Sequence, residues 1–175
     1  TDMNGTIASG MAEADERALI NRSLDVLEKG TGTRPRGWLS IARSQSFNTA
    51  GLLSEAGVDY MCDWVNDELP YAFQTKAGEI TNIPLNHELS DRQIINVQQQ
   101  SVDSYAQSIN DAASWLLSEA ETYGGRILPM HLTPYIMGLP YRIGVFEKLV
   151  EDLSQRGGVD FARGVTIVDS WKAQQ

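Results

Sequence analysis

Apolar residues recur every three or four positions in several segments of the chain, which is the spacing of one face of an α-helix. The clearest of these segments, residues 102–123, is preceded by Ser101, a good capping residue, and followed by Gly124-Gly125, which stops a helix. The same reading applies to four other segments. The predicted helices cover residues 11–29, 49–56, 102–123, 141–155 and 165–171.

Short apolar runs between these helices predict strands. Residues 65–79 and 133–140 are polar or contain proline, and we expect them to be loops. Alternation of helices and strands is typical of a parallel sheet or a (β/α) barrel, but the countable strands are too few to close an eight-stranded barrel. We therefore predict an α/β fold in a single domain over residues 1–175. The predicted strands cover residues 37–41, 58–64, 80–85, 126–132 and 159–162.

The charge balance narrows the classes of partner. The chain has 23 acidic and 14 basic residues and a net charge of -9, which disfavours nucleic acid because phosphate binding needs clustered Lys and Arg. No apolar run approaches the ~20 residues of a membrane span, and the N-terminus lacks the basic and apolar parts of a signal peptide. The single cysteine, Cys62, cannot form an internal disulfide. We therefore expect a cytoplasmic protein, and, because the first residue is Thr1 rather than methionine, further residues upstream.

Three segments place charged or aromatic groups beside apolar runs. They are Arg-Pro-Arg-Gly-Trp at 34–38, Cys-Asp-Trp-Val-Asn-Asp-Glu-Leu-Pro-Tyr at 62–71, and Ile-Leu-Pro-Met-His-Leu-Thr-Pro-Tyr at 127–135. In an α/β fold the carboxyl ends of strands hold the active site. Aromatic rings at such a rim can stack on a sugar or a planar ring, although ordinary core packing explains them equally well. The candidate substrate-binding rings are those of Trp38, Trp64, Tyr71 and Tyr135.

In combination, these segments resemble the later motifs of the polysaccharide deacetylase family, which includes metal-independent allantoinases. The resemblance runs from about Met11 to Trp171. The sequence at residues 37–38, 66–71 and 138–143 is most similar to the allantoinase-like branch. It implies a partial (β/α) barrel of the deacetylase type, the C-terminal half to two-thirds of the family fold. It also implies hydrolysis of a non-peptide C–N bond. The substrate would be an N-acetylated amino sugar or polysaccharide, or a cyclic amide such as allantoin.

The resemblance also implies roles for particular residues. Arg34 matches the arginine that keeps the family's catalytic Asp ionised, and Asp63 matches an acid that orients this arginine, so the two are expected to lie near each other. Trp64 matches the ring that walls the groove. His131 matches the proposed general acid, for which an imidazole with an ordinary pKa of ~6.5 is suited. His87 follows a predicted strand and is expected at the same rim as a substrate contact. The residues alone leave open a structural ion pair and buried or exposed structural histidines.

The metal ligands of the family do not appear in this chain. Metal-dependent members use an Asp-Asp pair and a His-x-x-x-His pair, whereas the only histidines here are His87 and His131, and no two aspartates are adjacent. A divalent metal, zinc above all, would be bound by upstream residues, or no metal would be used. Two histidines without a third ligand make a poor zinc site. Cys62 should point away from Asp63 by strand alternation, which disfavours it as a nucleophile.

Half of a barrel would leave a strand edge unpaired and part of a core uncovered, and such surfaces favour association. The alternative to an enzyme is therefore a non-catalytic subunit or a degenerate binding domain. Its partner would be a second copy of the chain or a complementary chain that completes the barrel.

Overall fold

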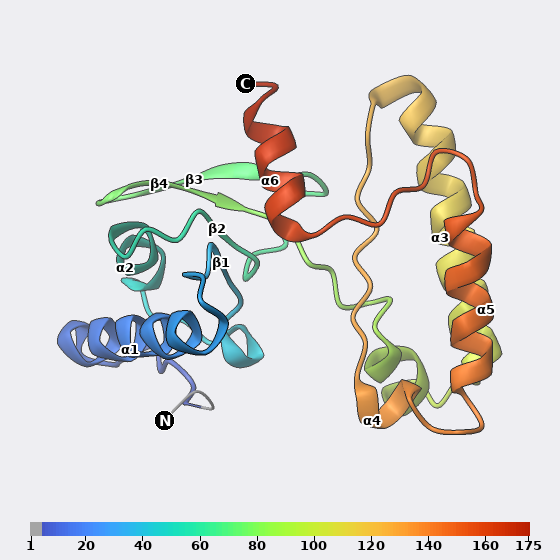
Figure 1. Cartoon of the computed structure of the whole chain (residues 1–175), viewed down its shortest axis with the longest axis horizontal. Helices are drawn as coiled ribbons and strands as arrows, with labels where there is room; N and C mark the ends of the chain where they lie inside the picture. The colour runs from blue at the N-terminus through green and yellow to red at the C-terminus, as the bar shows by residue number, and fades with distance from the viewer. Residues whose placement is uncertain (1–4) are drawn as a thin grey trace. The chain divides into compact units, whose positions relative to one another are not determined.

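The computed structural model describes residues 5–175, which divide into two compact units. The first unit contains the residues up to Leu85 together with Ala162–Gln175, and the second is Asn86–Phe161 (Figure 1). The sequence predicted one domain, and the two units are described separately below. Residues 1–4, which contributed to the expectation that no signal peptide is present, lie outside the described part. No helix in residues 5–175 is long and apolar enough to cross a membrane.

The first unit is built on a four-stranded sheet with the order β1-β2-β4-β3 (Figure 1). Strands β1, β2 and β4 are parallel, and β3 is antiparallel to β4. Trp38 pairs with Met61 and Met61 with Asn82, so the three parallel strands end at the same level. The strands are β1 (Gly37–Trp38), β2 (Tyr60–Met61), β3 (Tyr71–Thr75) and β4 (Gly78–Asn82).

Helices pack against this sheet through two apolar clusters. The larger one includes Ile20 and Leu24 of α1, Leu53 of α2, Met61 of β2 and Ile80 of β4. Because successive side chains of a strand point to opposite faces, Cys62, which follows Met61, lies in the other cluster, with Ile83 and with Val168 of α6. The helical elements of this unit are α1 (Glu13–Thr31), η1 (Ile41–Arg43), α2 (Thr49–Glu55) and α6 (Gly164–Lys172).

The second unit is helical. The face of α3 that the sequence predicted as apolar buries Tyr105 and Ile109 beside Leu149 and Leu153 of α5. Ser101 caps α3, because its hydroxyl accepts a hydrogen bond of 3.0 Å from the Ser104 amide. The elements are η2 (Arg92–Val97, a π-helical turn), α3 (Val102–Tyr123), α4 (Pro134–Met137) and α5 (Ile143–Ser154).

The α/β class and all five predicted helices are confirmed, but several strand predictions are wrong. Residues 126–132 and 159–162 form no strand, because no described strand pairs with them. The predicted loop at 65–79 contains β3, whose half-buried Tyr71, Phe73 and Thr75 alternate with exposed residues. The predicted loop at 133–140 contains the short helix α4. The strands predicted at 37–41 and 58–64 are each only two residues long.

Candidate functional site

The carboxyl ends of β1 and β2 are joined by hydrogen bonds to the side chain of Asp63. Its Oδ1 accepts from the Ser40 amide at 2.7 Å, and its Oδ2 accepts from the Ser40 hydroxyl at 2.7 Å and from the side-chain amide of Gln45. Trp38 Nε1 in turn donates to the Ser40 hydroxyl at 2.9 Å. Asp63 is only 7% exposed. These donors fix the orientation of a buried carboxyl group at the edge of the sheet where ligands of parallel α/β folds bind.

Arg34 does not contact Asp63. Its Nη1 donates to Asp25 Oδ1 at 3.0 Å and to Glu28 Oε2 at 2.9 Å, both on α1. These hydrogen bonds raise the pKa of the Arg34 guanidinium above its ordinary value. The reason for the separation is topological. Arg34 precedes β1, whereas Asp63 follows the parallel strand β2, so the two residues lie beyond opposite ends of the strands. The expected proximity of Arg34 and Asp63 is therefore not found.

The arginine beside Asp63 is instead Arg43, which the sequence analysis did not single out. Its Nη2 donates to the Leu85 carbonyl oxygen at 2.6 Å. Burial lowers the pKa of Arg43, and the negative charge of Asp63 partly offsets this effect. Ala42 and Arg43 both have a φ of 53°, in the left-handed region that non-glycine residues rarely adopt. No short sequence pattern marks this contact, because the turn brings Arg43 back to the strand ends.

Trp64 follows β2 and is held in place by contacts with Asn82 and Phe73. The side chain of Asn82, which is fully buried, accepts from the Trp64 amide at 3.2 Å and donates to the Trp64 carbonyl at 2.8 Å. The indole ring of Trp64 stacks on Phe73 with centroids 5.9 Å apart. Trp64 remains 40% exposed, which suits a ring that contacts a ligand. Trp38 is half-buried against the larger apolar cluster and also holds Ser40 in place.

Tyr71 lies at the start of β3 with its hydroxyl buried. Burial raises the pKa of this hydroxyl, and the nearby charge of Asp67 raises it further. The phenol therefore stays neutral at physiological pH. Tyr71 also lines a hollow of ≈ 610 Å³ with Glu79 of β4 and with Trp171 and Lys172 of α6.

In the second unit, the structure brings His87 and His131 together. The centroids of their rings are 4.4 Å apart, with a tilt of 54°. The segment that follows His131 is held by Asp91, which is fully buried and accepts from the Thr133 amide at 2.7 Å and from its hydroxyl at 2.9 Å. The Asp91 amide donates to the His131 carbonyl oxygen at 3.2 Å. Asp91 thus holds the segment that carries His131 in place, a role that no local sequence pattern indicated.

Two tyrosines belong to the same unit as the histidine pair. Tyr135, at the start of α4, is 70% exposed. Tyr105 of α3 is fully buried, and burial together with the charge of Asp91 raises its pKa to about 12, so its hydroxyl stays protonated. The predicted site residues therefore fall into two groups. Arg34, Trp38, Asp63, Trp64 and Tyr71 belong to the first unit, and His87, His131 and Tyr135 to the second.

The described residues do not fit a metal ion. Within residues 5–175, no group of three or more His, Cys, Asp or Glu side chains could hold one. His87 and His131 supply two ligands, and a protein zinc site ordinarily needs at least three. Cys62 is no substitute nucleophile, because burial raises the pKa of its thiol to about 12 and the reactive thiolate does not form at neutral pH.

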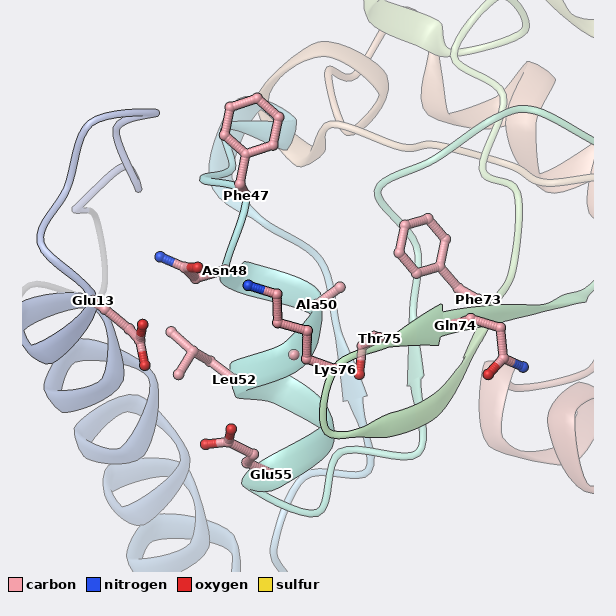
Figure 2. A pocket seen from close by; sticks show the side chains of 11 residues that line it. Glu13, Phe47, Asn48, Ala50, Leu52, Glu55, Phe73, Gln74, Thr75 and Lys76 are labelled. Atoms are coloured by element: carbon pink, nitrogen blue, oxygen red, sulfur yellow. The ribbon is translucent and has the colours of Figure 1, made fainter.

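A pocket of ≈ 240 Å³ lies between α1, α2 and the turn that joins β3 to β4. Figure 2 shows the side chains that line it. Its two acidic side chains, Glu13 and Glu55, share a single cation, Arg17, which forms an ion pair with each of them. None of the predicted site residues lines it, although Phe73 lines the pocket and also stacks on Trp64. We assign this pocket no role in the chemistry.

Comparison with known proteins places this geometry in context. No protein-family model and no curated protein matches the sequence. Among solved structures, a probable polysaccharide deacetylase from Pseudomonas aeruginosa PAO1 is 28% identical, with a TM-score of 0.85 over 97% of this chain and 57% of its own. PuuE allantoinase is 27% identical, with a TM-score of 0.83 over 95% of this chain and 56% of its own.

A third structure, a polysaccharide deacetylase-type protein from Mycobacterium smegmatis, shows likeness in fold, with 20% identity and a TM-score of 0.78 over 94% of this chain and 59% of its own. The chain thus spans a little over half the length of these structures. The resemblance to polysaccharide deacetylases and to an allantoinase is confirmed. The chain has the α/β fold of a partial deacetylase-type (β/α) barrel.

Proposed function

We propose that this chain is part of a hydrolase of non-peptide C–N bonds, and that its substrate is an N-acetylated amino sugar or polysaccharide. The observation that carries the proposal is the likeness to the probable polysaccharide deacetylase, which extends over 97% of this chain. Asp63 and its donors support it, because they lie at the carboxyl ends of parallel strands, where such folds hold their active sites. The products would be an amine and acetate.

Within this proposal, His131 acts as the general acid. As the C–N bond breaks, the departing nitrogen needs a proton, and an imidazole can supply it near neutral pH. His87 contacts the substrate beside it, which agrees with the 4.4 Å between the two ring centroids. Trp38, Trp64 and Tyr71 of the first unit, and Tyr135 of the second, each offer an aromatic ring for contact with a sugar ring. Asp63 holds the turn after β1 in place through Ser40 and Gln45.

A second candidate is the metal-free opening of a cyclic amide such as allantoin. It is favoured by the likeness to PuuE allantoinase, which is 27% identical over 95% of this chain. Both candidates are hydrolyses of an amide-type C–N bond, so the same residues serve either one. They differ in the substrate and in the expected need for a metal bound by residues outside this chain.

The test is to assay the full-length natural protein on both substrate classes. Acetate release from N-acetylglucosamine oligomers and loss of allantoin would be measured in parallel, each with and without EDTA. Acetate release that EDTA abolishes supports the deacetylase proposal. Allantoin hydrolysis that EDTA leaves unchanged supports the second candidate. Activity on neither substrate would remove both and leave the non-catalytic subunit as the better account.

A further inference from the structure

We propose that Arg43 is a substrate-binding residue. Its guanidinium donates hydrogen bonds to the carbonyl oxygen of the substrate as that oxygen becomes negatively charged. This inference deepens the proposed function and rests on it. The first unit would thus recognise the carbonyl oxygen of the substrate, through a residue that lies outside the matched motifs.

The position of Arg43 is the first argument. Arg43 lies in the turn that follows β1, it donates to the carbonyl oxygen of Leu85, which follows β4, and it feels the charge of Asp63, which follows β2. One side chain therefore interacts with the segments that leave all three parallel strands. Ligands of parallel α/β sheets bind at this edge.

The backbone of the turn is the second argument. Ala42 and Arg43 both have a φ of 53°, and each non-glycine residue in this region costs about 1 kcal/mol or more. Such strain persists where the surroundings enforce it, and it is concentrated at ligand-binding sites. Here the Arg43 amide donates to the Ser40 carbonyl at 2.9 Å, and Gln45 binds Asp63 on the other side.

The segment that follows is anchored as well. Glu16 of α1, which is fully buried, accepts hydrogen bonds from the hydroxyls of Ser46 and Thr49. A buried carboxyl group that accepts two hydrogen bonds fixes the position of the groups that donate to it. Glu16 thus holds the chain on the far side of the Arg43 turn.

The unused donors of Arg43 are the third argument. A guanidinium has five N–H donors. One protein hydrogen bond is found for this group, to Leu85, and the buried Nε has no protein partner within the described residues. Asp63 does not neutralise it by an ion pair, because its oxygens accept from Ser40 and Gln45. A half-buried cation in this state gains stability from a ligand oxygen.

The two arginines that precede β1 differ from Arg43, because both form ion pairs with carboxylates. Arg34 binds Asp25 and Glu28. Arg36 binds Asp59 and Asp169, the latter at 2.6 Å. Both positive charges are therefore already paired. Among these three arginines, Arg43 alone combines a position at the carboxyl edge of the sheet with an absence of ion pairs within the described residues.

The chemistry needs such a cation. When water adds to the carbonyl carbon, the π electrons of the C=O bond move onto its oxygen, and the proton of the water passes to a carboxylate base. As the tetrahedral intermediate collapses, the C=O bond re-forms, the C–N bond breaks, and the nitrogen leaves with a proton from the general acid. N–H donors aimed at the transient oxyanion lower the barrier, and removing one such donor typically costs 10²–10³-fold in kcat.

Replacement of Arg43 by glycine provides a sharp test. Glycine adopts a φ of 53° without strain, so Arg43→Gly removes the cation while relieving the turn. Arg163→Gly is a matched control, because Arg163 is exposed and precedes α6 at a capping position, where glycine is tolerated. We expect the Tm of Arg43→Gly to equal or exceed that of the wild type. We expect its kcat to fall 10²–10³-fold, while Arg163→Gly retains the wild-type kcat.

A binding experiment separates this proposal from the assigned reaction. Acetate, the product carboxylate, is titrated into each protein while the Trp38 indole N–H is followed by NMR, since this group reports on Ser40 and Asp63. Acetate-dependent shifts in the wild type and in Arg163→Gly, lost in Arg43→Gly, support the oxygen-binding role even if no hydrolysis is detected. If neither acetate response nor kcat depends on Arg43, the proposal is overturned, whereas the proposed hydrolysis stands or falls by the substrate assays.

Discussion

At the scale of single residues, two sets of hydrogen bonds hold the segments beside the candidate site residues. In one, Ser40 and Gln45 hold Asp63, and in the other Thr133 is held by Asp91. In both sets a buried carboxyl group accepts from a backbone amide and from side-chain donors, which is the arrangement that fixes a carboxylate most firmly. The segments that carry Arg43 and His131 are therefore held in defined positions before any substrate binds.

His131 is the residue whose loss should be most visible in kinetics. We expect His131→Ala to lower kcat by roughly 10²–10⁴-fold, because the departing nitrogen would then lack a general acid. The measurement is steady-state hydrolysis by the full-length protein on whichever substrate it accepts. His87→Ala is the comparison, and we expect it to change KM more than kcat, since His87 is proposed to contact the substrate. An unchanged kcat in His131→Ala would remove this residue from the mechanism.

The sequence showed part of this site and not the rest, for a physical reason. Asp63, Trp64 and His131 stand next to apolar runs, so a local pattern indicates them. Arg43 reaches Leu85 across 42 positions in the chain, and Asp91 reaches Thr133 across another 42. No local pattern encodes such contacts. Arg34 lies away from Asp63 because it precedes β1, whereas Asp63 follows the parallel strand β2.

At the scale of elements, Tyr60 of β2 joins the sheet to α6 through two glycines. A Cβ atom at Gly37 of β1 would overlap the Tyr60 ring, and one at Gly164 of α6 would lie 2.8 Å from the Tyr60 hydroxyl oxygen. The ring therefore occupies space that is available only because both neighbours lack a side chain. The Gly-Trp pair at 37–38, which the sequence analysis treated as a motif for function, has a packing role in β1.

We expect Gly37→Ala to destabilise the protein by about 1–3 kcal/mol, the usual cost of overpacking a tight contact. Urea unfolding followed by circular dichroism measures the change. Gly51→Ala on α2 is the control, because nothing lies within 4 Å of its added Cβ and alanine favours a helix. Combining Gly37→Ala with Tyr60→Leu should recover part of the loss. A Gly37→Ala variant as stable as Gly51→Ala would contradict this packing account.

Helix α6 is also tied to the sheet by charge. Asp169 binds Arg36, and this interaction lowers the pKa of Asp169 below its ordinary value. A depressed folded-state pKa contributes stability that is present above the unfolded value of ~3.9 and is lost as the pH falls through the lower folded value. The contribution should therefore begin to fall below about pH 4 and be lost at still lower pH.

We predict that acid changes the stability of the wild type and of the Asp169→Asn variant by different amounts. We expect Asp169→Asn to be slightly less stable than the wild type at pH 7, because Asp169 is an exposed group whose ion pair is screened by solvent. The difference should vanish as the pH approaches 2. Thermal melts of both proteins between pH 2 and 7 provide the measurement, with Asp152→Asn on α5 as a control for a helical i,i+4 pair. A gap that persists at pH 2 would show that Asp169 stabilises α6 by some other contact.

The sequence predicted the helices better than the strands, because a helix forms its backbone hydrogen bonds within itself and a strand does not. A helix such as α3 satisfies its own backbone, so its apolar spacing and its Ser101 cap were sufficient to define it. A strand exists only where another strand pairs with it. Residues 126–132 have the composition of a strand, yet no described strand pairs with them. By contrast, β3 forms because the turn at Lys76-Ala77 folds it onto β4.

At the scale of the whole molecule, the open edge of the sheet in the first unit is the most consequential feature. β1 is an outer strand, and the carbonyls of Arg36 and Trp38 face β2, where they accept from Tyr60 and Cys62. Successive backbone groups point in opposite directions, so those of Gly37 and Leu39 face the open edge. Leu39 is also 48% exposed. The outward backbone groups of this two-residue edge strand are the ones that another strand could pair with.

We therefore expect the 175-residue chain to associate through β1, with a second copy or with a complementary chain. Size-exclusion chromatography with light scattering should give a mass above the 19.3 kDa of one chain, rising with concentration. Leu39→Lys places a charge on the edge and should shift the protein towards the monomer, whereas Lys76→Ala, on the turn at the opposite end of the sheet order, should not. A wild-type chain that is monomeric at every concentration and melts cooperatively would show that the β1 edge needs no partner strand.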